Sequence, residues 1–198
     1  MRLRAPYVLV GLIAIVSGAC GSDEAATSTA ASTAASDVAP TAASQLTPKP
    51  VVRIGVRDYA FDRVPRTIKV GSLITITNTS SKEAHELIAF RLPEGETRPL
   101  SELRALPADE IGKLTAGAPA LGLVARPQAD GDVVLGDAAL HEPGRYLFVC
   151  FIPIGAKPDE VLKAMEKAAA DPNAGSPPIE GGPPRTTAGM IADVEVVA

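Results

Sequence analysis

The sequence has no tryptophan and few other aromatic residues, and its 198 residues include two cysteines and two histidines. Two cysteines cannot build a disulfide framework, and two histidines limit the number of metal sites. The net charge is −4, and no cluster of Lys and Arg follows the first four residues. Because nucleic-acid binding depends on a basic face that neutralises phosphates, we expect no nucleic acid among the partners.

Glycine and proline are abundant, with 17 and 18 residues. Turns should therefore be plentiful, and long helices cannot dominate the fold. Hydrophobic residues make up 46% of the chain and charged residues 21%, which is an ordinary globular composition. The length is enough for one domain with a hydrophobic core, and two full domains are not expected.

The first twenty residues have the pattern of an export signal. Arg2 and Arg4 precede an apolar run over 7–16, and three small residues then lead to Cys20. A basic start, a short apolar stretch and small residues before the cleavage point predict a signal peptide over residues 1–19. The apolar run is too short to be a dependable membrane span.

The end of this signal resembles a bacterial lipobox, which implies that Cys20 is lipidated and becomes the mature N-terminus. Ser17 stands where a lipobox usually has an aliphatic residue, and plain secretory cleavage near Ala19 is the alternative. In either case we expect an extracytoplasmic protein. The acidic mature chain gains nothing from anionic headgroups, so acyl chains on Cys20 would anchor it to the bacterial cell membrane.

Residues 20–50 consist mostly of Ala, Ser, Thr and Pro, and Val38 and Leu46 are their only large apolar side chains. Such a segment cannot bury enough apolar surface to offset the entropy of ordering it. We therefore interpret it as a disordered tether.

The pattern of residues 51–198 predicts one all-β domain. Short runs rich in β-branched residues alternate with turn residues, and they predict strands over 51–56, 67–70, 73–77, 85–92, 132–135, 145–151 and 190–197. A short helix is expected over 99–106, and a longer one over 158–170 within an insertion that spans 155–184. Short strands at this density predict a β-sandwich of about seven or eight strands.

Cys150 has no partner for a disulfide if Cys20 carries lipid. Within its strand, Tyr146, Phe148 and Cys150 share one face, and Leu147 and Val149 share the other. A lone thiol in an oxidising compartment is either buried and inert or functional, and the residues alone leave both readings open.

Three segments together resemble the cupredoxins, the small plastocyanin-like proteins with a blue type 1 copper site. Residues 144–153, GRYLFVCFIP, are similar to the segment that carries the cysteine ligand of this family. Residues 74–79 followed by 83–87 resemble the strand and loop that carry the first histidine, and 183–190 resemble the last ligand loop. The resemblance spans 51–197 and implies a Greek-key β-sandwich.

The resemblance also implies a copper site, which in this family has two histidines, a cysteine and a weak axial methionine. By position, His85 is the first histidine, Cys150 the thiolate and Met190 the axial ligand. Arg185 occupies the place of the second histidine, and a guanidinium has no lone pair to donate. Copper is thus the implied cofactor, and the set of ligands for it is incomplete.

No other residue is expected to complete the set. His141 precedes the turn before the strand of Cys150, and that strand covers about 16 Å, which places the two at opposite ends of the sandwich. Asp193, on the final strand, and Asp171, in the insertion, are not convincing replacements.

The remaining donors predict an unusual site. Sulfur ligands favour Cu(I), and the loss of one imidazole disfavours Cu(II). Arg185 would repel a metal ion and would also favour a thiolate on Cys150. These two effects oppose each other, and the sequence leaves open which prevails.

We therefore expect a membrane-tethered cupredoxin-like domain with a degenerate copper site, which acts as a weak Cu(I)-binding or interaction module. The alternative is a functional blue-copper electron-transfer protein. Its partner would be an envelope protein or a redox protein that the sequence does not identify. An enzyme is not expected, because copper oxidases need a trinuclear histidine cluster and no serine is linked by a motif to either histidine.

Overall fold

The computed structural model describes residues 48–170 and 178–198. They belong to one compact unit. The predicted signal peptide, Cys20 and the tether up to residue 47 lie outside the described residues. Pro50, the last residue of the predicted tether, already bonds to the domain, because its carbonyl accepts a hydrogen bond from the amide of Leu73. None of the described helices combines the length and the apolar character needed to span a membrane.

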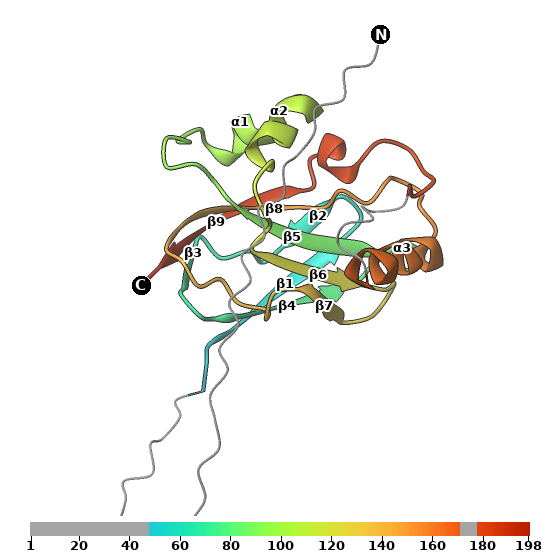
Figure 1. Ribbon diagram of the computed structural model, residues 1–198, viewed down its shortest axis with the longest axis horizontal. Coiled ribbons are helices and arrows are strands. Elements are labelled where there is room, and N and C mark those ends of the chain that lie inside the picture. The colour runs from blue at the N-terminus through green and yellow to red at the C-terminus, as the bar shows by residue number, and fades with distance from the viewer. Residues whose placement is uncertain (1–47, 171–177) are drawn as a thin grey trace, which may run out of the picture. The chain divides into compact units, whose positions relative to one another are not determined.

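The described residues form two sheets (Figure 1). The smaller sheet has the strand order β2-β1-β4, and the larger has the order β3-β9-β8-β5-β6-β7. The strands are β1 (Val51–Arg57), β2 (Ala60–Asp62), β3 (Thr67–Lys69), β4 (Leu73–Asn78), β5 (His85–Arg91), β6 (Leu121–Ala125), β7 (Gly131–Leu135), β8 (Gly144–Val149) and β9 (Ile191–Val197). This arrangement confirms the predicted β-sandwich.

The main core lies between the two sheets. β4 shows why: Ile74 and Ile76 are buried, and Thr75 and Thr77 on its other face are exposed, as the alternation predicts. β8 contributes Tyr146 and Phe148 to the same core, followed by Cys150. The predicted facing of these side chains is therefore confirmed.

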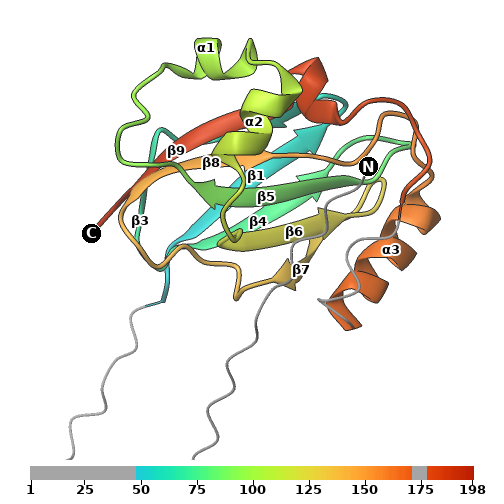
Figure 2. The same cartoon turned by 45° about the horizontal axis from the view of Figure 1, so that its top comes forward.

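A second, smaller core covers the outer face of the larger sheet. Leu147 and Val149 point to this side and pack with Leu103 of α1 (Leu100–Arg104) and Ile111 of α2 (Ala108–Leu114). Figure 2 shows both helices lying above β8 and β5. The larger sheet thus packs against apolar side chains on both of its faces. In the smaller sheet, by contrast, exposed threonines alternate with buried residues along β4.

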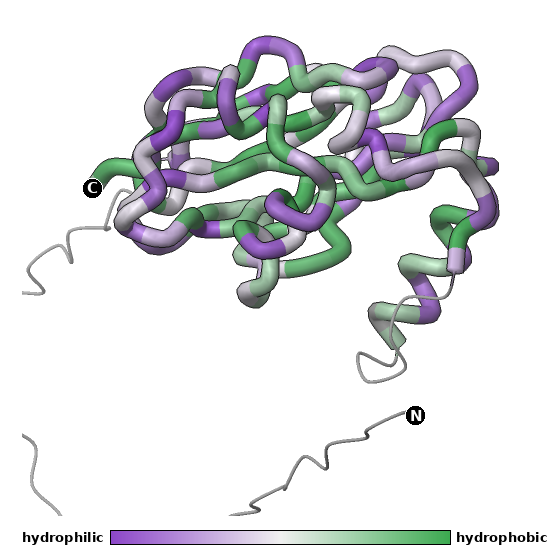
Figure 3. Tube along the Cα trace, turned by 90° about the horizontal axis from the view of Figure 1, so that it is seen from above, coloured by the Kyte–Doolittle hydropathy of each residue, from purple (hydrophilic) through white to green (hydrophobic). Residues whose placement is uncertain are grey.

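The predicted inserted helix is present as α3 (Pro158–Ala170). Val161 and Leu162 on one side of it are buried, and Lys163 and Glu166 are exposed. Figure 3 shows the corresponding change between hydrophobic and hydrophilic residues along this helix. The connection from β8 to the final strand therefore carries a helix with one apolar side.

The structure differs from the sequence prediction in four elements. The helix expected over 99–106 is shorter, and Pro107 separates it from α2, which the sequence analysis missed. β2 and β6 were also missed. All five residues of β6 are buried, so the strand lacks the alternation that marks a half-exposed strand. β2 has only three residues, too few for a periodic pattern to show.

Candidate metal centre

The four residues singled out from the cupredoxin resemblance lie at one end of the sandwich. His85 begins β5, Cys150 follows β8, and Met190 precedes β9. β8 runs antiparallel to both β5 and β9, so the start of β5, the end of β8 and the start of β9 meet at the same end. His85, Cys150, Met190 and Arg185 are all fully buried, each with an exposed fraction of 0%.

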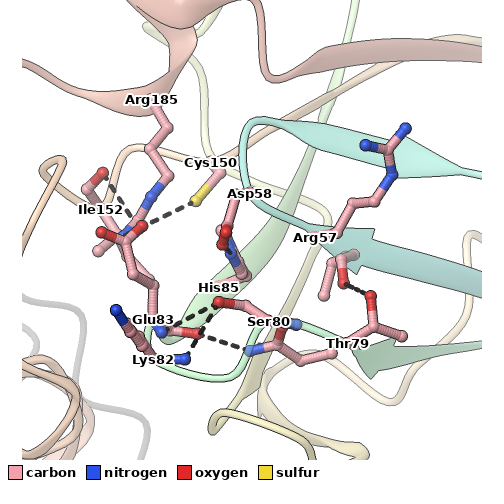
Figure 4. A network of polar contacts seen from close by, with 12 residues as sticks. Arg57, Asp58, Thr79, Ser80, Lys82, Glu83, His85, Cys150, Ile152 and Arg185 are labelled. Atoms are coloured by element: carbon pink, nitrogen blue, oxygen red, sulfur yellow. Dashed lines mark hydrogen bonds and ion pairs between the residues drawn. The ribbon is translucent and has the colours of Figure 1, made fainter.

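Arg185 is the first residue of a short 3-10 helix, Arg185–Ala188, and its side chain points into this end of the domain. Nη2 donates a hydrogen bond to Oε2 of Glu83 at 2.7 Å. Nη1 lies 3.4 Å from the carbonyl oxygen of Ile152 and 3.9 Å from Sγ of Cys150. Figure 4 shows the guanidinium between the thiol and the carboxylate. The positive charge of the site is therefore supplied by the chain itself.

Two acidic residues that the sequence analysis did not single out complete this cluster. Oδ1 of Asp58 lies 3.4 Å from Nε2 of His85. Ligand atoms of Asp58, Glu83 and His85 all lie within 4.8 Å of one another. Glu83 lies in the segment 83–87 that resembles the loop carrying the first histidine, so the sequence could have indicated that it lies near His85. Asp58 follows β1, and nothing in the sequence indicates that it lies beside the start of β5.

Two buried nitrogens of the cluster have no hydrogen-bond partner among the described residues: Nδ1 of His85 and Nε of Arg185. Unpartnered buried polar atoms are uncommon, because losing water without a replacement bond costs about 1–3 kcal/mol. With Nε2 of His85 facing Asp58, Nδ1 is a buried nitrogen that can offer its lone pair to a ligand.

The protonation of the site follows from its burial. Burial lowers the pKa of His85, and the positive charge of Arg185 lowers it further against the opposing pull of Asp58. Burial raises the pKa of the Cys150 thiol to about 12, and Glu86 adds to this, whereas Arg185 acts in the opposite direction without outweighing them. The site therefore holds a neutral imidazole and a neutral thiol beside a charged guanidinium. Arg185 therefore does not convert Cys150 to a thiolate, a question that the sequence left open.

The residues considered as replacement ligands lie elsewhere. His141 is exposed, and its Nε2 lies 2.8 Å from Oδ1 of Asp137, beyond the start of β8. Cys150 follows the other end of that strand, as predicted. Asp193 lies 2.6 Å from Nη2 of Arg145. Asp171 lies outside the described residues.

The donor set can be compared with the needs of copper. One imidazole, one sulfur of cysteine and one of methionine are buried at the same end of the sandwich, and the two sulfurs suit the preference of Cu(I) for soft ligands. The guanidinium contacts the thiol, and a metal ion there would place a second positive charge beside it. The residues therefore fit Cu(I) only with Arg185 displaced, and they do not fit Cu(II).

Glu86 follows His85 in β5 and is buried, with an exposed fraction of 5%. Its Oε1 accepts a hydrogen bond from the amide of Phe151 at 2.7 Å. Burial raises the pKa of its carboxyl to about 7, and the amides of Phe151 and Ile152 oppose this only in part. The folded chain thus holds a proton on Glu86 in a pH range where the unfolded chain does not.

This raised pKa predicts a pH-dependent stability. Between about pH 4.5 and 7 the folded state binds more protons at Glu86 than the unfolded state, so its contribution to stability falls as the pH rises, by about 3 kcal/mol in all. His85, whose pKa is lowered, contributes in the opposite direction. The free energy of unfolding should therefore be measured at pH 5 and pH 8 for wild type and Glu86→Gln. We expect wild type to lose about 3 kcal/mol relative to the variant; parallel curves would contradict the raised pKa.

Comparison with known proteins gives likenesses of structure. No family model matches the chain, and no curated protein sequence matches it. Among solved structures it is similar to an auracyanin from the photosynthetic bacterium Roseiflexus castenholzii, with 14% identity over 77% of this chain and 100% of that chain and a TM-score of 0.38. Auracyanin A of Chloroflexus aurantiacus, a blue copper protein, has 16% identity over 76% and 100%, with a TM-score of 0.36.

A multi-copper oxidase from Pediococcus acidilactici is also similar, with 11% identity over 75% of this chain and 26% of that chain and a TM-score of 0.35. These likenesses concern the arrangement of the strands and say nothing about which ligands this chain uses. The two sheets, their strand order and the core between them are those of a β-sandwich. The domain is a β-sandwich of two sheets, as the sequence predicts.

Proposed function

We propose that this protein is an extracytoplasmic, membrane-tethered interaction module, in which a cupredoxin-like domain keeps its scaffold and Arg185 takes the place of the metal ion. The observation that carries the proposal is the position of the guanidinium, which is fully buried and lies between Cys150 and Glu83. An ion pair inside the chain holds the end of the sandwich together without a cofactor. The partner is a protein of the cell envelope, bound through the surface of the domain.

Electron transfer is the weaker reading. A type 1 site needs two imidazoles and a thiolate that hold copper in both oxidation states. Here the second imidazole is replaced, and the thiol of Cys150 keeps its proton because burial raises its pKa. A guanidinium beside the thiol also opposes Cu(II) more strongly than Cu(I), because the charge to be accommodated is larger.

Weak Cu(I) binding is the second candidate, and a specific observation favours it. Nδ1 of His85 is buried without a partner among the described residues, at the end of the sandwich where Cys150 and Met190 are also buried. If Arg185 swings away from Cys150, these atoms could hold a soft monovalent ion. Copper would then be carried by His85, Cys150 and Met190, without a redox cycle.

Cu(I) affinity separates the two candidates. The full chain carrying Cys20→Ser, which leaves Cys150 as its one thiol, should be titrated with Cu(I) against a chromophoric chelator and compared with the same chain carrying Cys150→Ser as well. For an interaction module we expect no uptake that depends on Cys150. Stoichiometric uptake that Cys150→Ser abolishes would overturn this expectation and establish Cu(I) binding.

The tether has a test of its own, independent of copper. Lipid on Cys20 should carry the wild-type chain into the detergent phase in a phase-separation experiment, and Cys20→Ser should move it into the aqueous phase, since two or more acyl chains dominate the partition. Cys150→Ser is the matched control and should partition as wild type does. Equal partition of wild type and Cys20→Ser would rule out the lipid anchor.

A further inference from the structure

Three arginines lie in line on the outer face of the smaller sheet, opposite to the main core, and we call them the arginine row. Two of them belong to β1. Ile54 enters the core, so Arg53 and Arg57 point outward, and both are exposed. Figure 4 shows Arg57 directed away from Arg185. The exposed threonines of β4 show that this face of the sheet is open to solvent.

The third arginine, Arg63, follows β2 and lies over the glycine between the other two. A Cβ atom at Gly55 would lie 3.3 Å from Nη2 of Arg63 and 3.8 Å from its Nε. Glycine weakens a strand interior, and it occurs there where another group approaches the backbone closely. Arg63 itself has a φ of 59°, in the left-handed region that residues other than glycine rarely adopt. These two unusual features together place its guanidinium in the middle of the row.

The spacing of the arginine row follows the repeat of a strand. Its members occupy positions 53, 55 and 57 on the outer face of β1, because the guanidinium of Arg63 covers position 55. Positions two residues apart on a strand are separated by about 6.6 Å. Alternate side chains of any other extended chain have nearly the same separation. An extended segment that carries carboxylates on alternate residues can therefore match the row group by group.

The positive charge of the row is compensated only in part by its neighbours. Nε of Arg57 donates a hydrogen bond to Oδ2 of Asp62 at 2.6 Å. The side chains of Arg53 and Arg63 form no hydrogen bond or ion pair among the described residues. Asp130, at the edge of this face, already accepts a hydrogen bond from a threonine of β4. The row thus keeps an excess of positive charge in a chain whose net charge is −4.

We propose that the arginine row binds an extended acidic segment of the partner protein, with carboxylates on alternate residues facing the three guanidinium groups. A guanidinium pairs with a carboxylate through two parallel hydrogen bonds, which fixes the orientation of both. Each exposed pair contributes little by itself, so recognition depends on the match of all three. This inference names the partner of the interaction module and rests on that proposed function. Peptide binding tests the row and Cu(I) titration tests Cys150, so the failure of one is distinguishable from the failure of the other.

The test compares two fluorescent peptides of the same composition, with the full chain carrying Cys20→Ser. In one peptide three glutamates alternate with threonines, and in the other the three glutamates are adjacent. Binding is measured by fluorescence anisotropy at low ionic strength, because salt screens exposed charges. We expect the alternating peptide to bind at least fivefold more tightly, since all its carboxylates can face the row at once. Equal binding of the two peptides, or no saturable binding of the alternating one, would overturn the proposal.

Two double variants locate the binding site of the alternating peptide. Arg53→Gln with Arg63→Gln should weaken binding at least tenfold. The matched control is Arg66→Gln with Arg126→Gln, which removes the same charge from exposed residues outside the row and should weaken binding at most twofold. Equal losses for the two double variants would show that only net charge matters and would contradict the proposal. Tighter binding of the parent chain to anionic lipid vesicles than to the peptide, at equal negative charge, would assign the row to a membrane surface and overturn it.

Discussion

Glu83→Ala is expected to lower the free energy of unfolding by about 3–5 kcal/mol, because it leaves a buried cation without its counter-charge. The guanidinium of Arg185 has an exposed fraction of 0% and Glu83 one of 19%. Their 2.7 Å contact is the one carboxylate contact of this guanidinium among the described residues. The carbonyl of Ile152 and the thiol of Cys150 remain, but neither carries a negative charge.

Urea denaturation of wild type, Glu83→Ala and a control variant measures this loss. Glu94→Ala is a suitable control, because Glu94 is exposed and forms no ion pair among the described residues, and it should change stability by no more than about 0.5 kcal/mol. The double variant Glu83→Leu with Arg185→Met should recover much of the loss, since replacing both partners of a buried pair by apolar residues is often close to neutral. A loss for Glu83→Ala below about 1 kcal/mol would mean that the guanidinium does not depend on Glu83.

Arg185→His is expected to create a coloured copper site. The substitution removes the positive charge beside Cys150 and places an imidazole at the position where the cupredoxin resemblance expects the second histidine. Binding of Cu(II) would then displace the thiol proton of Cys150, because a metal-bound cysteine is deprotonated. With His85, Cys150 and Met190 already buried at one end of the sandwich, the variant should develop an intense thiolate-to-copper absorption in the visible range.

Two further variants show whether the colour arises from the new imidazole. Arg185→Gln removes the charge without supplying a ligand, and Arg185→His combined with Cys150→Ser removes the thiolate; both should stay colourless. All variants should carry Cys20→Ser, so that no second thiol takes up copper. A folded Arg185→His variant that stays colourless with one equivalent of Cu(II) would mean that the end of the sandwich does not have the geometry of a type 1 site.

Much of the fold could be predicted from the sequence, because its signals are local. The alternation in β4 and in β8 identified which side chains face the core, and Tyr146, Phe148 and Cys150 share it as expected. β6 was not predicted, because it is buried on both faces and so shows no alternation of buried and exposed residues. The spacing of Leu100, Leu103 and Leu106 predicted a helix up to residue 106, whereas α1 ends at Arg104.

The candidate site was predictable only where a resemblance supplied the positions. The sequence placed Arg185 at the missing ligand, but it could not show that the side chain turns inward to Glu83, since the two are 102 residues apart. The sequence could not predict the protonation state of Cys150 either. Burial and the positive charge of Arg185 act on the thiol in opposite directions, and only the structure shows that the sulfur is buried deeply enough for burial to prevail.

The most direct test of the account is the visible spectrum of the otherwise wild-type chain, carrying Cys20→Ser, during titration with Cu(II). The account holds that the guanidinium of Arg185 occupies the place of the metal and that Cys150 keeps its proton. It predicts that no thiolate-to-copper band develops, even with one full equivalent of Cu(II). A strong blue or green band would contradict it, because such a band requires a copper ion bound to the sulfur that Arg185 now contacts.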